Sequence, residues 1–505
     1  MKKTSKRRAP SIPYVSQNQL LISGFETRFH QNLDPSNRWV DLAGKIPWDE
    51  LSNLYLKRQP VKSTGRPPLN PRIVIGALII KHMCNLDDRE TISQITENIY
   101  MQFFLGYSGF LKEPPFDPSL FVEIRKRMGD DLITEMNLRI LKLSEPKQDE
   151  KADDGGSSGI THKGDLLMDA TATPQDIAFP TDLNLLNKAR IITEQVIDSL
   201  HVVGDKKVRT YRQIAHKEYL KVAQNRNPSR KTIYKAIGKQ LRFLRRNLKH
   251  IEVMLDTYST FPLSTKQQKQ YWVIQTLYAQ QLEMHTNRVH KVDDRIVSIH
   301  QPHIRPIVRG KAKARVEFGA KLHASLVNGF VFLDKISWDA YNEGAELDQY
   351  VEYYKSRFGF YPEKVLVDKI YCTRKNRAWL KERGIKLAAK PLGRPSAKAV
   401  ENHVRPGERN PIEGKFGQAK NGYGLNCIRA RLKNTSESWI ASIFMVLNLV
   451  KLAGMASYWL MFKSFSARLV SILFNLYKAD SHISRLLKKT GLGHSPRPVW
   501  RIKLS

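Results

Sequence analysis

The chain has 505 residues, in which 83 lysines and arginines stand against 48 acidic residues, for a formal net charge of +35. So strong a positive charge favours a polyanionic partner, with nucleic acid first and an anionic membrane surface second. The length provides for two or three domains. The three cysteines, Cys84, Cys372 and Cys427, form no CxxC pair, which argues against a zinc ribbon or a disulfide framework and favours a reducing cytoplasm.

The N-terminal part, residues 1–143, is predicted to be helical. Its first eight residues are basic and no apolar segment follows, so we expect an arm that contacts phosphate and not a secretory signal. Helices are predicted over Pro71–Cys84, over Asp88–Asn98 and after Asp117, which is a suitable N-cap before Pro118. The third helix carries a basic outer face: Arg125, Lys126 and Arg127. This pattern fits a helix-turn-helix-like DNA reader, and equally a helical bundle with solvated basic residues.

A polar, glycine-rich stretch at 144–160 is predicted to be a flexible linker, and β-like segments follow it. Leu166–Thr171 and Gln175–Phe179 flank a turn at Pro174 and are expected to form a hairpin. Val316–Leu333 contains Asn328-Gly329, a strong signal for a second hairpin. Strands are also predicted at Lys364–Asp368 and Ile385–Ala389, with a helix over 376–383 between them. Strands that alternate with helices in this way indicate a mixed α/β domain.

Residues 184–300 form a long helical insertion between the first two β regions. Apolar residues recur there at spacings of three and four and predict a long helix: Ile233, Ile237, Leu241, Leu244, Leu248, Ile251 and Leu255. Between 201 and 260 there are 15 lysines and arginines against 4 acids, so the opposite face is strongly positive. The insertion is either a solvated appendage or a clamp on DNA, and the excess of like charge favours the clamp.

Three carboxylates are candidates for a shared metal site. Asp169 and Asp368 each close a short apolar run, and Glu413 falls in the first turn of a helix predicted after Pro411. Carboxylate oxygens suit Mg²⁺, and two such ions can stabilise the attacking and leaving oxygens of a phosphodiester. Arg409 and Lys420 flank Glu413 and suit contacts to phosphate, although such a trio is also typical of a surface ion-pair network.

At these residues the sequence resembles the bacterial insertion-sequence DDE transposases of the IS-Four and IS-Five superfamily, in particular the IS-Eleven-eighty-two-like group. The likeness covers most of the chain, and its matching stretches run in one order: Arg66–Arg127, Met168–Thr171, Pro180–Leu186, Pro306–Lys311, Glu317–Lys321, Asp368–Arg377, Leu392–Pro395, Arg409–Lys420 and Gly422–Leu425.

The resemblance implies an RNase H-like catalytic core in which Asp169, Asp368 and Glu413 hold two Mg²⁺ or Mn²⁺ ions. It places Arg409 and Lys420, in the family's R-x3-E-x6-K arrangement, near the DNA backbone. The family's tyrosine three residues before that arginine is missing, since Pro406 stands there. Further cations are expected to contact DNA, with a solvated surface as the alternative for the last two: Arg309, Lys311, Lys321, Arg429 and Arg431.

The expected organisation is an all-α DNA-binding domain at 1–143, the linker, a catalytic domain at 161–460 interrupted by the insertion, and a basic tail at 461–505. The expected function is binding of the element's terminal inverted repeats, followed by metal-dependent DNA cleavage and strand transfer. A nuclease of the same fold and an inactive DNA-binding regulator are the alternatives. The expected partners are double-stranded DNA and a second copy of the chain. We expect a cytoplasmic, nucleoid-associated protein, with the apolar stretch Trp439–Phe462 as a buried helix and not a membrane span.

Overall fold

The computed structural model describes residues 33–58, 68–144, 162–202, 207–308, 316–389 and 407–454. The chain divides into two compact units, Met1–Asn448 and Leu449–Ser505. In the second unit only Leu449–Gly454, the end of a helix, is described. The predicted linker, the N-terminal arm, the basic tail and Pro406 lie outside the described residues.

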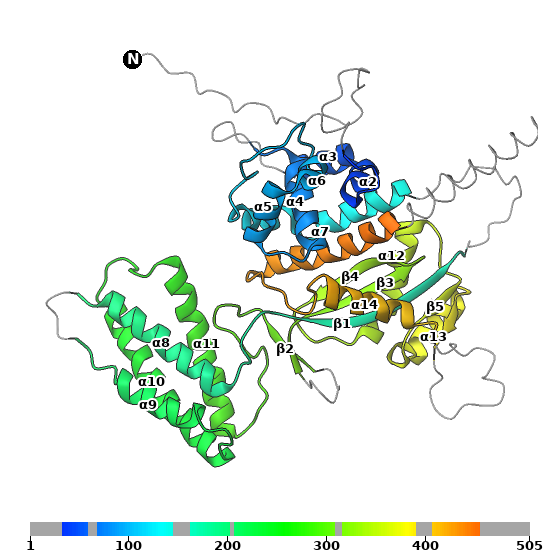
Figure 1. The fold of residues 1–505 in the computed structure, drawn as a ribbon. Coiled ribbons are helices and arrows are strands. Elements are labelled where there is room, and N and C mark those ends of the chain that lie inside the picture. The colour runs from blue at the N-terminus through cyan, green and yellow to red at the C-terminus, as the bar shows by residue number, and fades with distance from the viewer. Residues whose placement is uncertain are drawn as a thin grey trace, which may run out of the picture. The chain divides into compact units, whose positions relative to one another are not determined.

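The N-terminal region is a cluster of helices packed around α4 (Figure 1). Asn70 caps α4 by accepting the Arg72 N–H, and Pro71 occupies the first turn, as the sequence predicts. Nearly every residue of α4 is buried, so it is the central helix. Trp39 and Trp48 each pack against Phe104, with ring centroids 5.2 Å apart. The helices are α2 (Arg38–Lys45), α3 (Trp48–Lys57), α4 (Pro71–Met83), α5 (Asp88–Glu97), α6 (Ile99–Phe104) and α7 (Leu120–Ser144).

One six-stranded sheet forms the centre of the following region, in the order β2-β3-β1-β5-β6, with β4 paired to β3. β1 runs antiparallel to β3 and parallel to β5, and β5 is parallel to β6. The predicted turn at Asn328-Gly329 is confirmed, since both residues have positive φ and join β3 to β4. The strands are β1 (Asp165–Pro174), β2 (Arg305–Val308), β3 (Val316–Val327), β4 (Phe330–Ser337), β5 (Lys364–Leu366) and β6 (Lys386–Ala388).

The hairpin predicted around Pro174 is wrong. β1 continues through Pro174 and pairs along its length with β3, whose Gly319 lies opposite the proline. The next residue, Gln175, is buried and donates hydrogen bonds to the Ala430 carbonyl and the Ser436 hydroxyl. Tertiary pairing and these side-chain bonds therefore decide the course of the chain, and Pro174 marks the end of a strand instead of a turn.

Helices α12 (Leu347–Phe358) and α13 (Arg374–Glu382) follow β4 and β5 in the chain and lie beside the sheet (Figure 1). The apolar helix Lys433–Gly454 has the length and hydropathy of a membrane span, but 72% of its most apolar window is buried inside the protein. Asn448, fully buried, accepts the Val331 N–H and donates to the Val331 carbonyl and to Asn137 of α7. This helix is therefore bonded to β4 and α7 through a polar side chain.

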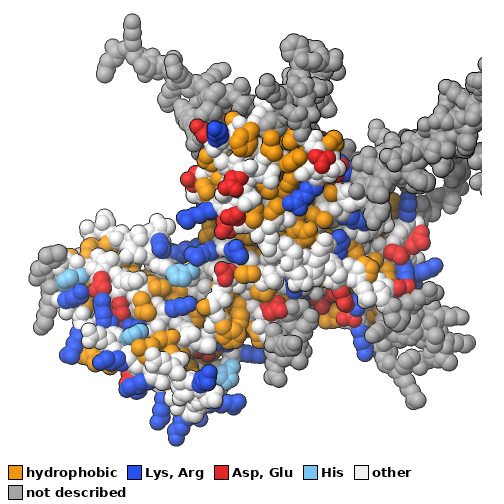
Figure 2. All heavy atoms as spheres, in the orientation of Figure 1, with side chains coloured by type: hydrophobic (Ala, Val, Ile, Leu, Met, Phe, Trp, Pro, Cys, Tyr) orange, Lys and Arg blue, Asp and Glu red, His pale blue; other side chains and the backbone are white. Residues whose placement is uncertain are grey.

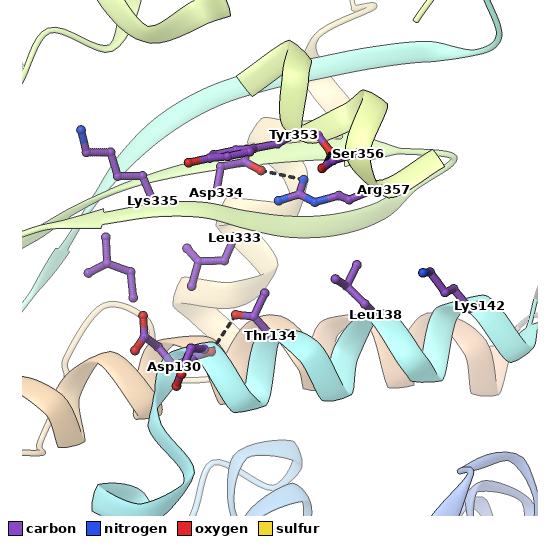
Figure 3. A pocket seen from close by; sticks show the side chains of 12 residues that line it. Asp130, Thr134, Leu138, Lys142, Leu333, Asp334, Lys335, Tyr353, Ser356 and Arg357 are labelled. Carbon is purple, nitrogen blue, oxygen red and sulfur yellow. Dashed lines mark hydrogen bonds and ion pairs between the residues drawn. The ribbon is translucent and has the colours of Figure 1, made fainter. Parts of the chain in front are cut away.

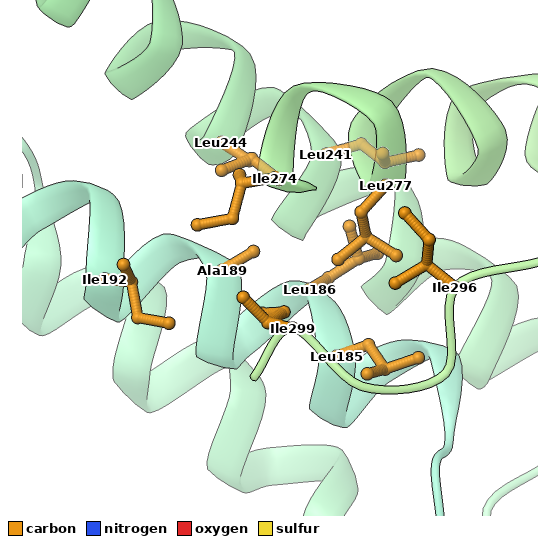
Figure 4. Packing of buried hydrophobic residues seen from close by; sticks show 10 residues of the cluster. All are labelled: Leu185, Leu186, Ala189, Ile192, Leu241, Leu244, Ile274, Leu277, Ile296 and Ile299. Atoms are coloured by element: carbon orange, nitrogen blue, oxygen red, sulfur yellow. The ribbon is translucent and has the colours of Figure 1, made fainter. Parts of the chain in front are cut away.

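The insertion is a separate group of four helices: α8 (Asp182–Leu200), α9 (Arg212–Ala223), α10 (Arg230–Leu255) and α11 (Thr265–Asn287). The predicted stripe lies on α10, where Leu241 and Leu244 pack with residues of α8 and α11 in a buried cluster (Figure 4). Ile251 belongs to a second cluster with Tyr271 of α11. The segment predicted to be helical is helical, and its first helix begins at Asp182, two residues before the predicted boundary.

Candidate active site

The register of the sheet places Asp169 and Asp368 side by side. β1 and β5 are parallel neighbours with Leu167 opposite Leu366, and each aspartate follows two residues later. Because adjacent parallel strands lie about 4.8 Å apart, equal steps along both bring the two carboxylates to the same level of the sheet. Two acids about 200 positions apart in the sequence thus lie side by side in the fold.

Arg409 joins these two acids. One terminal nitrogen, Nη1, lies 3.1 Å from Asp368 Oδ1, and the other, Nη2, lies 3.5 Å from Asp169 Oδ2. Its Nε is buried and has no hydrogen-bond partner in the described part of the chain. The guanidinium therefore neutralises both carboxylates from the residue that caps α14 (Asn410–Gly422).

The two aspartates differ in their exposure. The Asp169 side chain is 20% exposed and that of Asp368 56% exposed, so the pair faces solvent from one side. Burial raises the pKa of Asp169 above its ordinary value. The Ala170 N–H and Arg409 stabilise the ionised form and lower the pKa, but their effect is smaller than that of burial. Glu343 and Asp368 add to the rise as like charges. A carboxylate whose charge is this poorly solvated is suited to binding a cation.

Glu413 is in the first turn of α14, as predicted, but on its exposed side. Ile412, Phe416 and Ala419 form the buried face of this helix, so the intervening Glu413 points away from the apolar contact. Among the described residues no three His, Cys, Asp or Glu side chains lie close enough to share a metal ion. The structure thus brings two of the predicted acids together, and the third lies on the helix that begins beside their arginine.

Glu343 is an acid that the sequence does not single out. It opens the 3-10 helix Glu343–Glu346, and its charge acts on both Asp169 and the buried Tyr371. Lys321 Nζ lies 2.9 Å from Glu343 and donates to the Tyr341 carbonyl. Lys321, predicted to contact DNA, thus forms an ion pair within the protein. The sequence signal was weak, because Glu343 follows no strand and belongs to no recognisable spacing.

The other predicted DNA contacts fall into three groups. Lys126, Arg127, Arg429 and Arg431 are exposed, and Lys420 is half-buried. Arg309 and Lys311 lie outside the described residues.

Arg125 is not on the outer face, which corrects the prediction. Its side chain is buried and makes a bidentate pair with Asp88, both N–O distances being 2.8 Å. Lys81 shares the same carboxylate at 2.9 Å, and both cations lie over the ring of Trp439. Arg125 therefore helps to hold helices together, because Asp88 and the indole face stabilise its charge inside the protein.

A second polar cluster lies behind the acid pair, on β3, β4 and α12. The Asp334 side chain is fully buried. It lies 3.1 Å from His323 Nδ1, accepts a hydrogen bond from the Ser325 hydroxyl at 2.5 Å and forms an ion pair with Arg357 at 2.7 Å. Burial acts to raise the pKa of Asp334, but Arg357 and the hydrogen bonds from His323 and Ser325 outweigh it, and the pKa is lowered. Figure 3 shows Asp334 and Arg357 at a cavity of about 400 Å³ between α7 and β4. This cluster positions strands and is separate from the aspartate pair.

Comparison with known proteins identifies two transposase domains in the chain. Residues 365–450 match the model of a Transposase DDE domain, and residues 27–127 match that of a Transposase domain (DUF772). The chain is also 33% identical over 180 residues to "Uncharacterized protein ORF8 in nfe locus" of Rhizobium meliloti, a similarity that covers 36% of this chain and 80% of that protein. The chain belongs to the DDE-type insertion-sequence transposases. The DDE match includes Asp368, Arg409 and Glu413 of the transposase, while Asp169 lies before it. No solved structure matches the transposase.

Proposed function

We propose that this transposase binds the terminal inverted repeats of its own insertion sequence and catalyses metal-dependent cleavage and strand transfer of DNA. The observation that carries the proposal is the pair of aspartates, one on β1 and one just after β5, neutralised by one arginine. Acids gathered in this way at the edge of a basic protein suit a reaction on a phosphodiester.

The sheet supports an RNase H-like core of the IS-Four and IS-Five superfamily, in its IS-Eleven-eighty-two-like group. Three antiparallel strands, β1, β3 and β4, are followed by two strands parallel to β1. Asp169 lies within β1 and Asp368 just after β5, its parallel neighbour. In this proposal the helical insertion interrupts the catalytic domain between β1 and β2, and α2–α7 form the DNA-binding domain.

The donor set fits divalent cations, because carboxylate oxygens are the ligands that Mg²⁺ and Mn²⁺ prefer. Asp169, Asp368 and Glu413 would hold two such ions, which supply an activated water or 3′-hydroxyl and stabilise the leaving oxygen. Arg409, which pairs with both carboxylates, would turn to a DNA phosphate once they are otherwise neutralised. Lys420, Arg429, Arg431, Lys126 and Arg127 would contact the DNA backbone.

The acids are tested by Asp169→Asn, Asp368→Asn and Glu413→Gln, with Mg²⁺ and a DNA duplex that carries the element's end. We expect each variant to bind DNA and to cleave it at least about a hundredfold more slowly, since even the partners that orient metal ligands contribute about 10–100-fold. Asp176→Asn, at an exposed acid just after β1, is the matched control and should cleave as the parent does. Full activity of the three variants would show that the acids are wrongly assigned.

Joined products separate strand transfer from simple hydrolysis. We expect the parent to join the element's 3′ end to a target duplex, and products that are cut but never joined would identify a nuclease of the same fold. Two ends must be held together for joining, so we propose a homodimer in the synaptic complex. We place the transposase in the bacterial cytoplasm, at the nucleoid, with Lys433–Gly454 as a helix of the protein core.

A further inference from the structure

Helix α10 of the insertion carries a large excess of positive charge. Between Arg230 and Leu255 there are eight lysines and arginines and one acid, Glu252. Four of these cations follow each other at spacings of four, three and three residues, which places them on one face of the helix: Lys235, Lys239, Arg242 and Arg245. All four are exposed. Figure 2 shows many lysine and arginine side chains spread over the insertion, at the lower left of the view.

These four cations line a groove between α10 and α11. The groove has a volume of about 440 Å³, and Tyr234, Leu241, Tyr278 and Leu282 also line it. Gly238 lies in the middle of α10, where a Cβ would come within 3.0 Å of His285 Nε2. The absence of a side chain there allows α11 to approach α10 closely, and Tyr234 and His285 stack across the contact with centroids 4.1 Å apart.

Most of the groove's charge is not neutralised by the residues that the structure describes. Lys239 pairs with Glu218 of α9, but Lys235, Arg242 and Arg245 form no ion pair with any described residue. Cations so close on one helix face repel each other and destabilise the helix by a few tenths of a kcal/mol per pair. A polyanion that lies along the groove would remove this repulsion.

We infer that the α10–α11 groove binds the sugar-phosphate backbone of duplex DNA. This inference rests on the proposed function, because it takes the same DNA as its ligand and assigns a second contact surface on it. From Lys235 to Arg245 the helix rises about 15 Å, the length of roughly four base pairs. The cations thus match a row of phosphates, whereas a small anion would occupy only one or two of them.

The test compares two variants of the full chain that lose the same total charge. The groove variant carries Lys235→Gln, Arg242→Gln and Arg245→Gln. The control variant carries Lys217→Gln, Lys266→Gln and Lys269→Gln, three exposed lysines of the same insertion that do not line the groove. Fluorescence anisotropy on a duplex of the element's end and its flank gives the affinity at several salt concentrations, and footprinting gives the protected stretch.

We expect the groove variant to lose about 2.7 units of the slope of log affinity against log salt, since each contacted phosphate contributes about 0.9. Its footprint should be shorter by roughly four base pairs, since the stripe rises about 15 Å. The control variant should keep the parent's slope and footprint.

Equal losses in both variants would overturn the inference, because they would show a general effect of net charge. Parent-like DNA binding by the groove variant, with weaker binding to phosphatidylglycerol vesicles, would also overturn it and would assign the groove to a membrane surface. If the parent itself bound no duplex DNA, the proposed function would fail, and this outcome is distinct from a failure of the groove alone.

Discussion

At the scale of the residue, Asp169 shows a conflict between stability and chemistry. Its carboxylate is largely withdrawn from water and lies near Glu343 and Asp368, with a single bridging cation, Arg409. Poor solvation of its charge raises its pKa, so the ionised form is maintained at a cost to the fold. Such a group stabilises the protein least at the pH where it would bind metal.

We therefore predict that Asp169→Asn stabilises the metal-free protein at neutral pH. A carboxyl group with a raised pKa favours the folded state only while it is protonated, and this contribution is lost as the pH rises through the raised pKa. The advantage of the variant should be present at about pH 7 and vanish near about pH 4, the ordinary aspartate value. Thermal unfolding midpoints over this range, with a chelator present, measure it.

The control is Asp176→Asn, which changes an exposed carboxylate and should leave the pH profile of stability as it is in the parent. A variant at Asp169 that is less stable than the parent at neutral pH would mean that the pair with Arg409 contributes more than burial of the charge costs.

The sequence indicated some of the charged residues of the site, but it did not indicate which partners their charges would meet in the fold. Asp169 and Asp368 stood out because each closes an apolar run. The parallel register of β1 and β5 does bring them together, although Asp169 lies within β1 and not at its end. Arg125 was predicted to be exposed together with its neighbours on α7, Lys126 and Arg127. It is buried because its partners, Asp88 and Trp439, come from distant segments of the chain. Glu343 was missed because only the folded chain brings it near Asp169.

At the scale of the element, the apolar helix Lys433–Gly454 depends on one polar side chain. Asn448 satisfies both the N–H and the carbonyl of Val331 and also reaches Asn137. A buried backbone group that loses its partner costs about 1–3 kcal/mol. The helix is thus fixed in register against β4 by hydrogen bonds in addition to its apolar packing.

We predict that Asn448→Ala lowers the free energy of unfolding by roughly 2–6 kcal/mol, because two buried backbone groups lose partners at about 1–3 kcal/mol each. Ser442→Ala is the control on the same helix, since the Ser442 hydroxyl donates only to the Ser438 carbonyl, one turn away. We expect that change to cost less than about 1 kcal/mol. Urea unfolding compares the two, and equal losses would contradict the role given to Asn448.

Most elements were predictable from local signals, and the exceptions have a common cause. Three predictions that depend on neighbouring residues alone are confirmed: the helix start at Pro71, the turn at Asn328-Gly329 and the apolar stripe of α10. The hairpin at Pro174 failed because β1 finds its partners in β3, about 150 residues later in the chain, where no local pattern could indicate the pairing.

At the scale of the whole molecule, the charge of +35 predicts a strong effect of salt on DNA binding. A protein that contacts six to ten phosphates releases their counterions and loses about 10³–10⁵ in affinity between about 50 and about 200 mM salt. We expect the transposase to lose at least about a hundredfold over this range. Anisotropy titrations in potassium chloride measure it, and a flat response would contradict DNA as the main partner of the charged surface.

The parallel pairing of β1 with β5 also sets the order in which activity can arise during synthesis. Asp169 and Asp368 leave the ribosome about 200 residues apart, an interval of roughly 10–40 s at about 5–20 residues per second. The helices of the insertion can form meanwhile from local contacts, but the acid pair cannot, and Arg409 emerges later still. A product that ends after the insertion would carry the cations of α10 without Asp368 or Arg409. If the α10–α11 groove binds DNA as we propose, we expect such a fragment to occupy DNA without cutting it and so to inhibit the complete transposase.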